Sequence, residues 1–143
     1  MLKGKRKLKR KNKFIFDVDG TLTPSRQAID KRFAVWFRLF CQSNDVYLVT
    51  GSDRPKTLEQ IGETIYNSCN RVYNCNGNDV WEKDINVRTN EWVLPEDAHE
   101  WLSIQLTESP FKIRTGLHFE HRPGMVNFSI VGRNANPEER KEY

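Results

Sequence analysis

The residues best suited to chemistry follow a short apolar stretch, and they read Asp17-Val18-Asp19-Gly20-Thr21-Leu22-Thr23. Two carboxylates two residues apart can divide the work of phosphoryl transfer. One can attack phosphorus as a nucleophile and form an aspartyl phosphate, while the other donates and accepts protons at the leaving or entering oxygen. Gly20 permits a tight turn, and Thr21 can offer a hydroxyl to the phosphate. A bare Asp-x-Asp also occurs in ordinary capped loops, but the full run after an apolar strand favours this chemistry.

A second polar run, Thr50-Gly51-Ser52-Asp53, follows the apolar stretch Val46-Tyr47-Leu48-Val49. A hydroxyl together with free backbone N–H groups at the start of a helix makes an anion site. Either Thr50 or Ser52 can supply that hydroxyl, and Ser52 can instead cap the helix that follows. The run therefore predicts a phosphate ligand without choosing between the two hydroxyls.

Arginines toward the C-terminal end form a third candidate group. Along residues 125–133 the odd-numbered residues share one face of a predicted strand, and this face is mostly polar, includes Asn127 and ends in Arg133. Arg140 lies at the fourth position of a short helix for which Asn136 is the predicted cap. A lone surface arginine is usually solvated, but the planar guanidinium can grip a phosphate through two hydrogen bonds. These side chains are therefore candidate phosphate ligands.

The elements that must position these residues alternate between strands and helices. Apolar runs predict strands over 14–18, 46–49 and 71–74, each short and bounded by polar residues. Asp30 should cap one intervening helix, and Pro55 should open the other. This order predicts an α/β core with a parallel βαβαβ sheet, and such sheets bind ligands at the carboxyl ends of their strands. Asp17 lies at such an end.

After Asn78 the pattern changes. Residues 79–92 predict a hairpin or two short strands, and residues 96–106 predict a helix. Three further strands, over 111–114, 117–122 and 125–131, should form an antiparallel meander. The chain is therefore expected to comprise a leader (1–13), a core (14–78) and an α+β part with antiparallel strands (79–143).

The net charge of +4 hides a strong asymmetry. Residues 1–13 hold eight of the 23 Lys and Arg residues and none of the 19 Asp and Glu residues, so the remainder, with 15 basic and 19 acidic residues, has a net charge of −4. We expect this leader to be disordered because its like charges repel one another. It is either a solubilising leader or a weak binding segment for a polyanion such as nucleic acid.

No apolar stretch approaches the 18 residues that a membrane span needs, and the leader lacks the apolar segment of a signal peptide. The three cysteines, Cys41, Cys69 and Cys75, are an odd number without Cys-x-x-Cys spacing. A disulfide framework is therefore not expected, and we predict a cytoplasmic protein without a membrane partner.

These stretches resemble the haloacid dehalogenase (HAD) superfamily and, more closely, the eukaryotic-type phosphomannomutase family within it. The heptad of residues 17–23 resembles the first HAD motif, and residues 48–53 are similar to the second. The longer run from Phe16 to Arg26 carries the resemblance to the phosphomannomutases. The most specific stretch runs from Phe119 to Arg133. Further matches are Asn76-Gly77 after the third core strand and Pro137-Glu138-Glu139-Arg140 near the end.

The resemblance implies a partial HAD-like Rossmannoid core followed by a partial cap. The implied activity is that of a Mg²⁺-dependent phosphotransferase, which interconverts mannose 6-phosphate and mannose 1-phosphate through an aspartyl phosphate. By the same resemblance Asp17 is the nucleophile, Asp19 is the general acid and base, and both take part in holding Mg²⁺. The implied phosphate and substrate ligands are Arg26, Thr50, Gly51, Ser52, Arg122, Asn127, Arg133 and Arg140.

The sequence departs from the family after its second motif. The family needs a lysine beside the aspartyl phosphate and a further acidic motif for the metal, and neither has a counterpart in this sequence. We therefore expect a chain truncated within the cap, weak or inactive by itself, whose first strand has an unpaired edge. The expected partners are a hexose phosphate and either a second copy or a complementing C-terminal core polypeptide. Two other functions stay open: a HAD sugar phosphatase, and a non-catalytic protein or half of a split enzyme.

Overall fold

The structure, a computed structural model, describes residues 12–143, so the predicted leader 1–13 lies almost entirely outside the described residues. The chain divides into two compact units, one ending at Val87 and one beginning at Arg88. None of the helices in the described range is long and apolar enough to cross a membrane.

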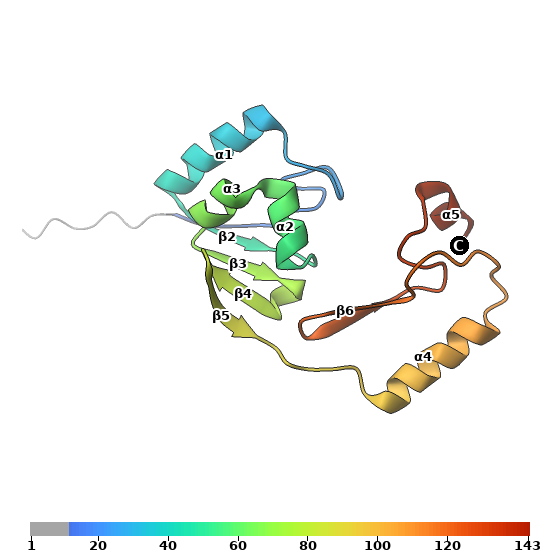
Figure 1. The fold of residues 1–143 in the computed structure, drawn as a ribbon. Coiled ribbons are helices and arrows are strands. Elements are labelled where there is room, and N and C mark those ends of the chain that lie inside the picture. The colour runs from blue at the N-terminus through green and yellow to red at the C-terminus, as the bar shows by residue number, and fades with distance from the viewer. Residues whose placement is uncertain (1–11) are drawn as a thin grey trace, which may run out of the picture. The chain divides into compact units, whose positions relative to one another are not determined.

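The first unit is built on a five-stranded sheet in the order β1-β2-β3-β4-β5 (Figure 1). β1, β2 and β3 are parallel, and β4 is antiparallel to β3. The strands span Lys13–Phe16 (β1), Asp45–Val49 (β2), Arg71–Asn74 (β3), Asp79–Glu82 (β4) and Ile85–Thr89 (β5). The predicted α/β fold with a parallel βαβαβ arrangement is confirmed.

Three helices lie on one face of this sheet (Figure 1): α1 (Lys31–Ser43), α2 (Arg54–Ile61) and α3 (Glu63–Ser68). α1 begins after Asp30 as predicted, because the Asp30 carboxylate accepts hydrogen bonds from the backbone N–H groups of the first turn. The single helix predicted after Pro55 is two helices. Gly62 separates them with a φ of 77°, which no right-handed helix accommodates.

The core of the first unit fills the space between the sheet and these helices. Strand residues Val46, Leu48 and Val72 alternate with more exposed neighbours and point toward the helices. They pack in one cluster with buried residues such as Phe37 of α1 and Tyr66 of α3. Full burial of side chains of this size contributes roughly 1.5–3 kcal/mol each to folding. This packing fixes the strand ends on which the candidate site stands.

The opposite face of the sheet is open. Ile15 on β1 is 71% exposed, and Val49 on β2 is 40% exposed. Together with Tyr47 and Tyr73 they line a hollow of about 820 Å³. Parallel sheets normally have both faces covered, but the first unit by itself provides no layer over this apolar face.

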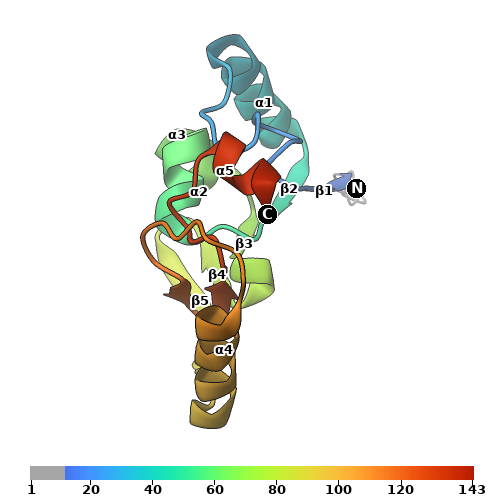
Figure 2. The same cartoon turned by 90° about the vertical axis from the view of Figure 1, so that its right-hand side faces the viewer.

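β1 also has a free edge, because within the described part of the chain it pairs only with β2. Figure 2 shows β1 and β5 at opposite edges of the sheet. The predicted unpaired edge of the first strand is therefore present.

The division between the units falls later than the expected boundary after residue 78. The hairpin formed by β4 and β5 belongs to the first unit because β4 extends the core sheet beside β3, with Tyr73 opposite Val80. A short 3₁₀ turn over Cys75–Gly77 reverses the chain between these two strands. The sequence predicted the hairpin but assigned it to the second part of the chain.

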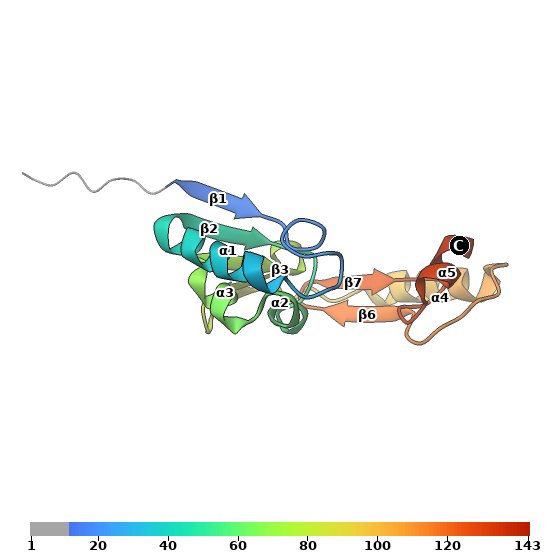
Figure 3. The same cartoon turned by 90° about the horizontal axis from the view of Figure 1, so that it is seen from above.

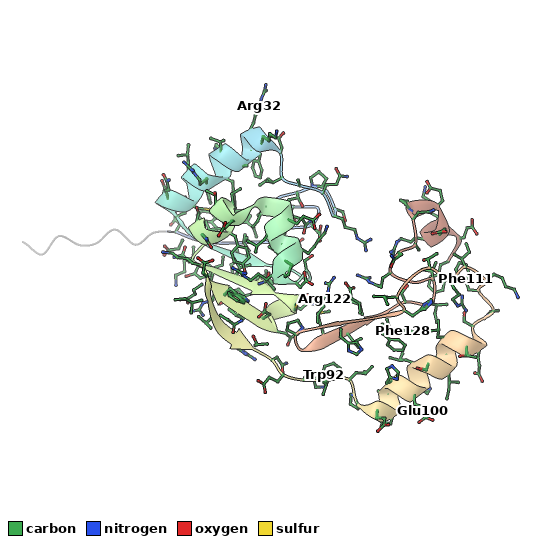
Figure 4. All side chains as sticks on the ribbon, in the orientation of Figure 1. Arg32, Trp92, Glu100, Phe111, Arg122 and Phe128 are labelled. Atoms are coloured by element: carbon green, nitrogen blue, oxygen red, sulfur yellow. The ribbon has the colours of Figure 1, made fainter. Side chains whose placement is uncertain are left out.

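The second unit packs a helix against a two-stranded antiparallel sheet, β6 and β7, whose arrows run in opposite directions in Figure 3. Its elements are α4 (Glu96–Glu108), β6 (Phe119–Arg122), β7 (Met125–Phe128) and α5 (Pro137–Glu142). Phe128 points from the sheet toward α4 (Figure 4), and its ring lies 5.0 Å from that of Phe119. The apolar and polar faces predicted for this strand are thus separated. α5 begins with the predicted capping box at Asn136.

The predicted strand over residues 111–114 is wrong. The Arg114 side chain donates hydrogen bonds to the carbonyls of Phe111 and Ile113, and also to those of Leu106 and Ser109 at the end of α4. Carbonyls of this segment accept hydrogen bonds from a guanidinium instead of from the backbone N–H groups of a neighbouring strand. The sheet of this unit has two strands instead of the expected three.

Gly132 makes the close turn that leads to Arg133. Its φ is 95°, and a Cβ at this position would lie 1.8 Å from the carbonyl oxygen of Thr115. The backbone N–H of Thr115 donates to the Val131 carbonyl at 2.9 Å, so the two segments lie against each other. Only glycine fits this approach.

We expect Gly132→Ala to destabilise the second unit by at least about 1–3 kcal/mol, because the strained φ and the backbone clash act together. Thermal unfolding followed by NMR signals of residues 88–143 would measure this loss. The control is Gly77→Ala in the first unit, where φ is 87° but a Cβ meets nothing within 4 Å. A Gly132→Ala variant as stable as the wild type would contradict the steric requirement.

Candidate active site

A tight turn after β1 carries the two aspartates. The Val18 carbonyl accepts hydrogen bonds from the backbone N–H groups of residues 21, 22 and 23, at 3.2, 3.0 and 3.1 Å, and Gly20 N–H donates to the Thr23 carbonyl at 2.8 Å. Val18 is fully buried. Its neighbours Asp17 and Asp19 are consequently more exposed, at the carboxyl end of the strand.

Asp19 is held by donors from three segments of the chain. Its Oδ1 accepts the backbone N–H of Arg26 and the side-chain Nε2 of Gln60, both at 2.7 Å. Its Oδ2 accepts the Ser52 hydroxyl at 3.4 Å. Because these donors come from the β1 loop, the β2 loop and α2, this one carboxylate joins all three.

These contacts keep Asp19 ionised. Partial burial raises the pKa of Asp19, but the hydrogen bonds from the Arg26 N–H, the Gln60 amide and the Ser52 hydroxyl outweigh it and lower the pKa below its ordinary value. A carboxylate held in this state is ionised and can accept a proton, although its lowered pKa makes it a weaker base than a free carboxylate.

Asp17 has fewer contacts than Asp19. It is exposed, and the hydrogen bond recorded for its carboxylate comes from the Thr21 hydroxyl at 3.5 Å, near the limit for such a bond. A lightly held, exposed carboxylate is accessible to a phosphorus atom. The two aspartates of the run therefore have different environments, as a division of roles between them requires.

Gln60 is the residue that sequence patterns did not single out. It is only 2% exposed, and its Nε2 also lies 3.4 Å from the Thr23 hydroxyl. Since a carboxylate can only accept, Nε2 must face Asp19, and this leaves the buried Oε1 without a partner within the described residues. The sequence did contain a signal for Gln60. Its spacing from Thr57 and Ile61 puts all three on the inward face of the helix, and a polar amide is unusual there.

The Thr50-Gly51-Ser52 run lies beside this carboxylate. The Thr50 Oγ1 accepts the Ser52 backbone N–H at 3.1 Å, and the Thr50 carbonyl accepts the Asn76 N–H at 2.9 Å. Gly51 is exposed between them. The cap of α2 is Asp53, which accepts the Lys56 N–H, so Ser52 is not the capping residue. The Ser52 hydroxyl is instead directed to Asp19.

Arg26 contacts the site through its backbone. Its φ of 60° is a left-handed conformation that aims its N–H at Asp19, and its side chain is exposed. The Arg26 charge also contributes to the lowered pKa of Asp19. The guanidinium therefore lies near enough to influence an anion at this loop.

The donor atoms of the loop suit a hard cation only in part. No group of three or more His, Cys, Asp or Glu residues with metal-binding geometry occurs in the part of the chain that the structure describes. The Asp19 side chain is engaged by donors, whereas the Asp17 carboxylate is exposed. Mg²⁺ often uses one or two protein oxygens and completes its shell with water and phosphate. Asp17 and the Asp19 main chain fit that pattern.

The second unit has its own polar cluster around Glu120. Its Oε1 accepts Arg122 Nη2 at 3.0 Å, and its Oε2 accepts Arg133 Nε at 2.7 Å and Asn127 Nδ2 at 3.3 Å. Arg140 donates through Nε to the Ala135 carbonyl at 2.8 Å and through Nη2 to the Arg133 carbonyl at 2.9 Å. The three predicted arginines and Asn127 therefore belong to one connected network.

Glu120 was missed as the centre of this network. Partial burial raises its pKa, but the hydrogen bond from Arg122 and the charges of Arg122 and Arg133 hold the pKa below its ordinary value. The signal lay in the spacing, because residues 120 and 122 share one strand face and Asn127 is the cross-strand partner of Glu120.

Comparison with known proteins identifies relatives of this chain. A model of the family described as eukaryotic phosphomannomutase matches residues 36–143. A phosphomannomutase of Saccharomyces cerevisiae is 31% identical over 135 residues, which cover 90% of this chain and 53% of that protein. A phosphomannomutase of Spinacia oleracea is 32% identical, with coverage of 90% and 54%. The chain spans about half the length of the curated relatives it matches.

Among solved structures, an IMP-bound mutant of the Plasmodium falciparum IMP-nucleotidase gives a TM-score of 0.51 at 12% identity, covering 93% of this chain and 43% of that one. A haloacid dehalogenase-like hydrolase from Bacteroides thetaiotaomicron gives 0.48 at 20% identity, covering 68% and 39%. At such identities the first match reports similarity of fold alone.

We predict that Gln60→Leu raises the pKa of Asp19, because it removes the strongest side-chain donor to that carboxylate. The folded pKa of Asp19 lies below its ordinary value, so the ionised group stabilises the fold above that value, and this contribution disappears as the pH falls through the folded pKa. Gln60→Leu should shrink the contribution. Carboxyl NMR titration of Asp19 measures the shift, with the exposed Gln42→Leu as control. An unchanged pKa would show that the amide does not hold Asp19.

Proposed function

Because this chain belongs to the eukaryotic phosphomannomutase family, we propose that it takes part in phosphoryl transfer on hexose phosphates through Asp17. The observation that carries the proposal is the contrast between the two aspartates of one turn. Asp17 is exposed and lightly held, whereas Asp19 is fixed and ionised by three donors. That is the arrangement needed for a nucleophile and a proton carrier acting side by side.

In this proposal Asp17 attacks phosphorus and forms an aspartyl phosphate as the bond to the sugar oxygen breaks. Asp19 supplies the proton to that departing oxygen. In the return step a sugar hydroxyl attacks the aspartyl phosphate, gives its proton to Asp19, and releases Asp17 as a carboxylate. Asp19 is ionised at the start of the return step, as the acceptance of a proton requires. For the forward step, Asp19 must acquire a proton when the bound phosphate adds negative charge beside it.

We assign Mg²⁺ to the Asp17 carboxylate and the Asp19 backbone carbonyl, since the Asp19 side chain is engaged by hydrogen-bond donors. When bound there, the ion would offset the negative charge that carboxylate and phosphate bring together. Thr50 is the better hydroxyl ligand for the phosphate. Its Oγ1 accepts the Ser52 N–H and so keeps its proton for another acceptor, whereas the Ser52 hydroxyl already donates to Asp19. Gly51 and Arg26 are the other phosphate ligands that we propose in the first unit.

The network of Arg122, Asn127, Arg133 and Arg140 is the proposed clasp for the sugar phosphate. This role is supported by the contacts of the arginines, because each one donates a hydrogen bond to a carboxylate or a carbonyl and is partly shielded from water. Arginines held in this way lose less conformational entropy when a phosphate binds.

We further propose that the open face of the core sheet and the free edge of β1 bind a polypeptide that completes the core. The apolar hollow lined by Ile15, Tyr47 and Val49 supports this partner, as does the half-length match to the relatives. Exposed apolar side chains in the second unit, such as Trp101 and Ile104, make a second copy of the chain the other candidate. A cytoplasmic location is supported by three free, buried cysteines.

We expect the polypeptide of residues 1–143 to show phosphomannomutase activity near background by itself. Phosphoryl transfer depends on positively charged groups placed around the phosphoryl group, and each of these charged groups contributes about 10²–10³ in rate. Activity should appear on co-expression with the second half of the Saccharomyces cerevisiae relative and should vanish with Asp17→Asn. A coupled assay for mannose 1-phosphate measures it, and parallel release of inorganic phosphate would reveal a phosphatase. Robust Mg²⁺-dependent turnover by the chain alone would contradict this expectation.

Affinity for mannose 6-phosphate should depend on Arg133. Arg133→Ala removes a charge-assisted contact of about 1.5–3 kcal/mol, so binding should weaken roughly tenfold or more. Arg133→Lys should restore only part of the affinity because the planar fork is lost. Calorimetry measures both, with Arg88→Ala, an exposed arginine outside the network, as a control of equal charge. Equal affinity for the wild type and Arg133→Ala would remove Arg133 from the clasp.

A further inference from the structure

Glu120 lies at the centre of the arginine network without having been assigned a role. Its two carboxylate oxygens contact Arg122, Arg133 and Asn127 at 2.7–3.3 Å. The side chain of Glu120 is 31% exposed, and those of Arg122 and Arg133 are 13% and 26% exposed. These ion pairs are therefore partly shielded from water, where a charge interaction is stronger than at a fully exposed surface.

Two guanidinium groups that flank one carboxylate would repel each other without it. Both side chains are long and have several rotatable bonds, so they would separate into solvent if the carboxylate were removed. A phosphate that arrived at such a surface would have to bring the two cations together by itself. With Glu120 in place, folding has already brought them together.

The contacts that Glu120 makes leave donors for a ligand. A guanidinium has five N–H donors. Glu120 engages the Nε of Arg133 and the Nη2 of Arg122, so the two terminal nitrogens of Arg133 are not used in this contact. Arg133 is thus fixed through its Nε and can present its two terminal nitrogens to an anion.

The backbone of Arg133 is already fixed by other contacts. Its N–H donates to the Leu117 carbonyl at 2.7 Å, its carbonyl accepts Arg140 Nη2 at 2.9 Å, and the turn before it requires Gly132. The remaining freedom of this residue is in its side chain. Glu120 restricts it through the 2.7 Å bond to Nε.

We propose that Glu120 is the positioning residue of the sugar-phosphate clasp: it holds the Arg122 and Arg133 guanidiniums side by side for one phosphate. This inference rests on the proposed function of the clasp. Glu120 does not touch the substrate in this role, because it acts through the two arginines.

A purely electrostatic effect of Glu120 has the opposite sign. A carboxylate near an anion site repels phosphate, so its removal would then tighten binding. If Glu120 positions the arginines, its removal weakens binding although a negative charge has been lost. The sign of the change therefore separates the two effects.

The experiment compares Glu120→Ala, Glu120→Gln and Glu138→Ala in the full 143-residue chain, with mannose 6-phosphate and inorganic phosphate as probes in NMR titrations. Glu138 is exposed in the first turn of α5, so its removal deletes the same charge from the same unit and leaves Glu120 in place. We expect Glu120→Ala to weaken binding of mannose 6-phosphate threefold or more. Glu120→Gln should fall between Glu120→Ala and the wild type because one acceptor oxygen remains. Glu138→Ala should bind as well as the wild type or slightly better.

A second readout does not depend on the ligand. The Nε–Hε signal of Arg133 should be protected from exchange in the wild type and in Glu138→Ala, and should lose protection in Glu120→Ala. Binding by Glu120→Ala that equals or exceeds that of Glu138→Ala, or an unchanged Arg133 signal, overturns the positioning role. A wild type that binds neither probe refutes the proposed clasp itself, which is a separate failure. Thermal unfolding of Glu120→Gln shows whether the unit stays folded in these comparisons.

Discussion

A partly buried carboxylate must be given donors, and this requirement organises both units of the protein. An ionised carboxylate that loses water without gaining hydrogen bonds costs several kcal/mol. Asp19 meets the requirement with donors from Arg26, Gln60 and Ser52, and Glu120 meets it with Arg122, Arg133 and Asn127. Asp19 joins segments that are distant in the sequence, whereas Glu120 joins its own strand to β7 and to the turn that carries Arg133. The candidate functional residues are therefore positioned by the need to satisfy one anion in each unit.

The same requirement explains how two aspartates in one turn acquire different properties. The turn buries Val18 and places Asp17 and Asp19 on either side of it along the chain. Only Asp19 meets the donors that the β2 loop and α2 bring to this edge of the sheet. Asp17 keeps its exposure. The roles proposed for the two aspartates fit these environments, because a nucleophile needs access and a proton carrier needs fixed geometry.

The core sheet shows the opposite situation, in which a requirement of the fold is not met by the residues of the first unit. One face is packed by α1, α2 and α3, while the other carries exposed Ile15 and half-buried Tyr47 and Tyr73 around an open hollow. The free edge of β1 adds unpaired backbone groups to this surface. A surface with these properties favours association, and the length of the curated relatives, of which this chain covers 53–55%, is consistent with a larger core.

The sequence by itself determined the features that depend on neighbours along the chain. Short apolar runs predicted the parallel strands, Asp30 and Asn136 predicted helix starts, and the position of Asp17 after β1 predicted the candidate site. Tertiary structure decided the contacts that give those residues their properties. Gln60 reaches Asp19 across 41 positions, β4 joins the first unit by pairing with β3, and the Arg114 guanidinium takes the carbonyls of a predicted strand. Local sequence patterns encode helix and strand periodicity and helix caps. Which distant acceptor a given donor binds is decided only when packing brings the two groups within hydrogen-bonding distance.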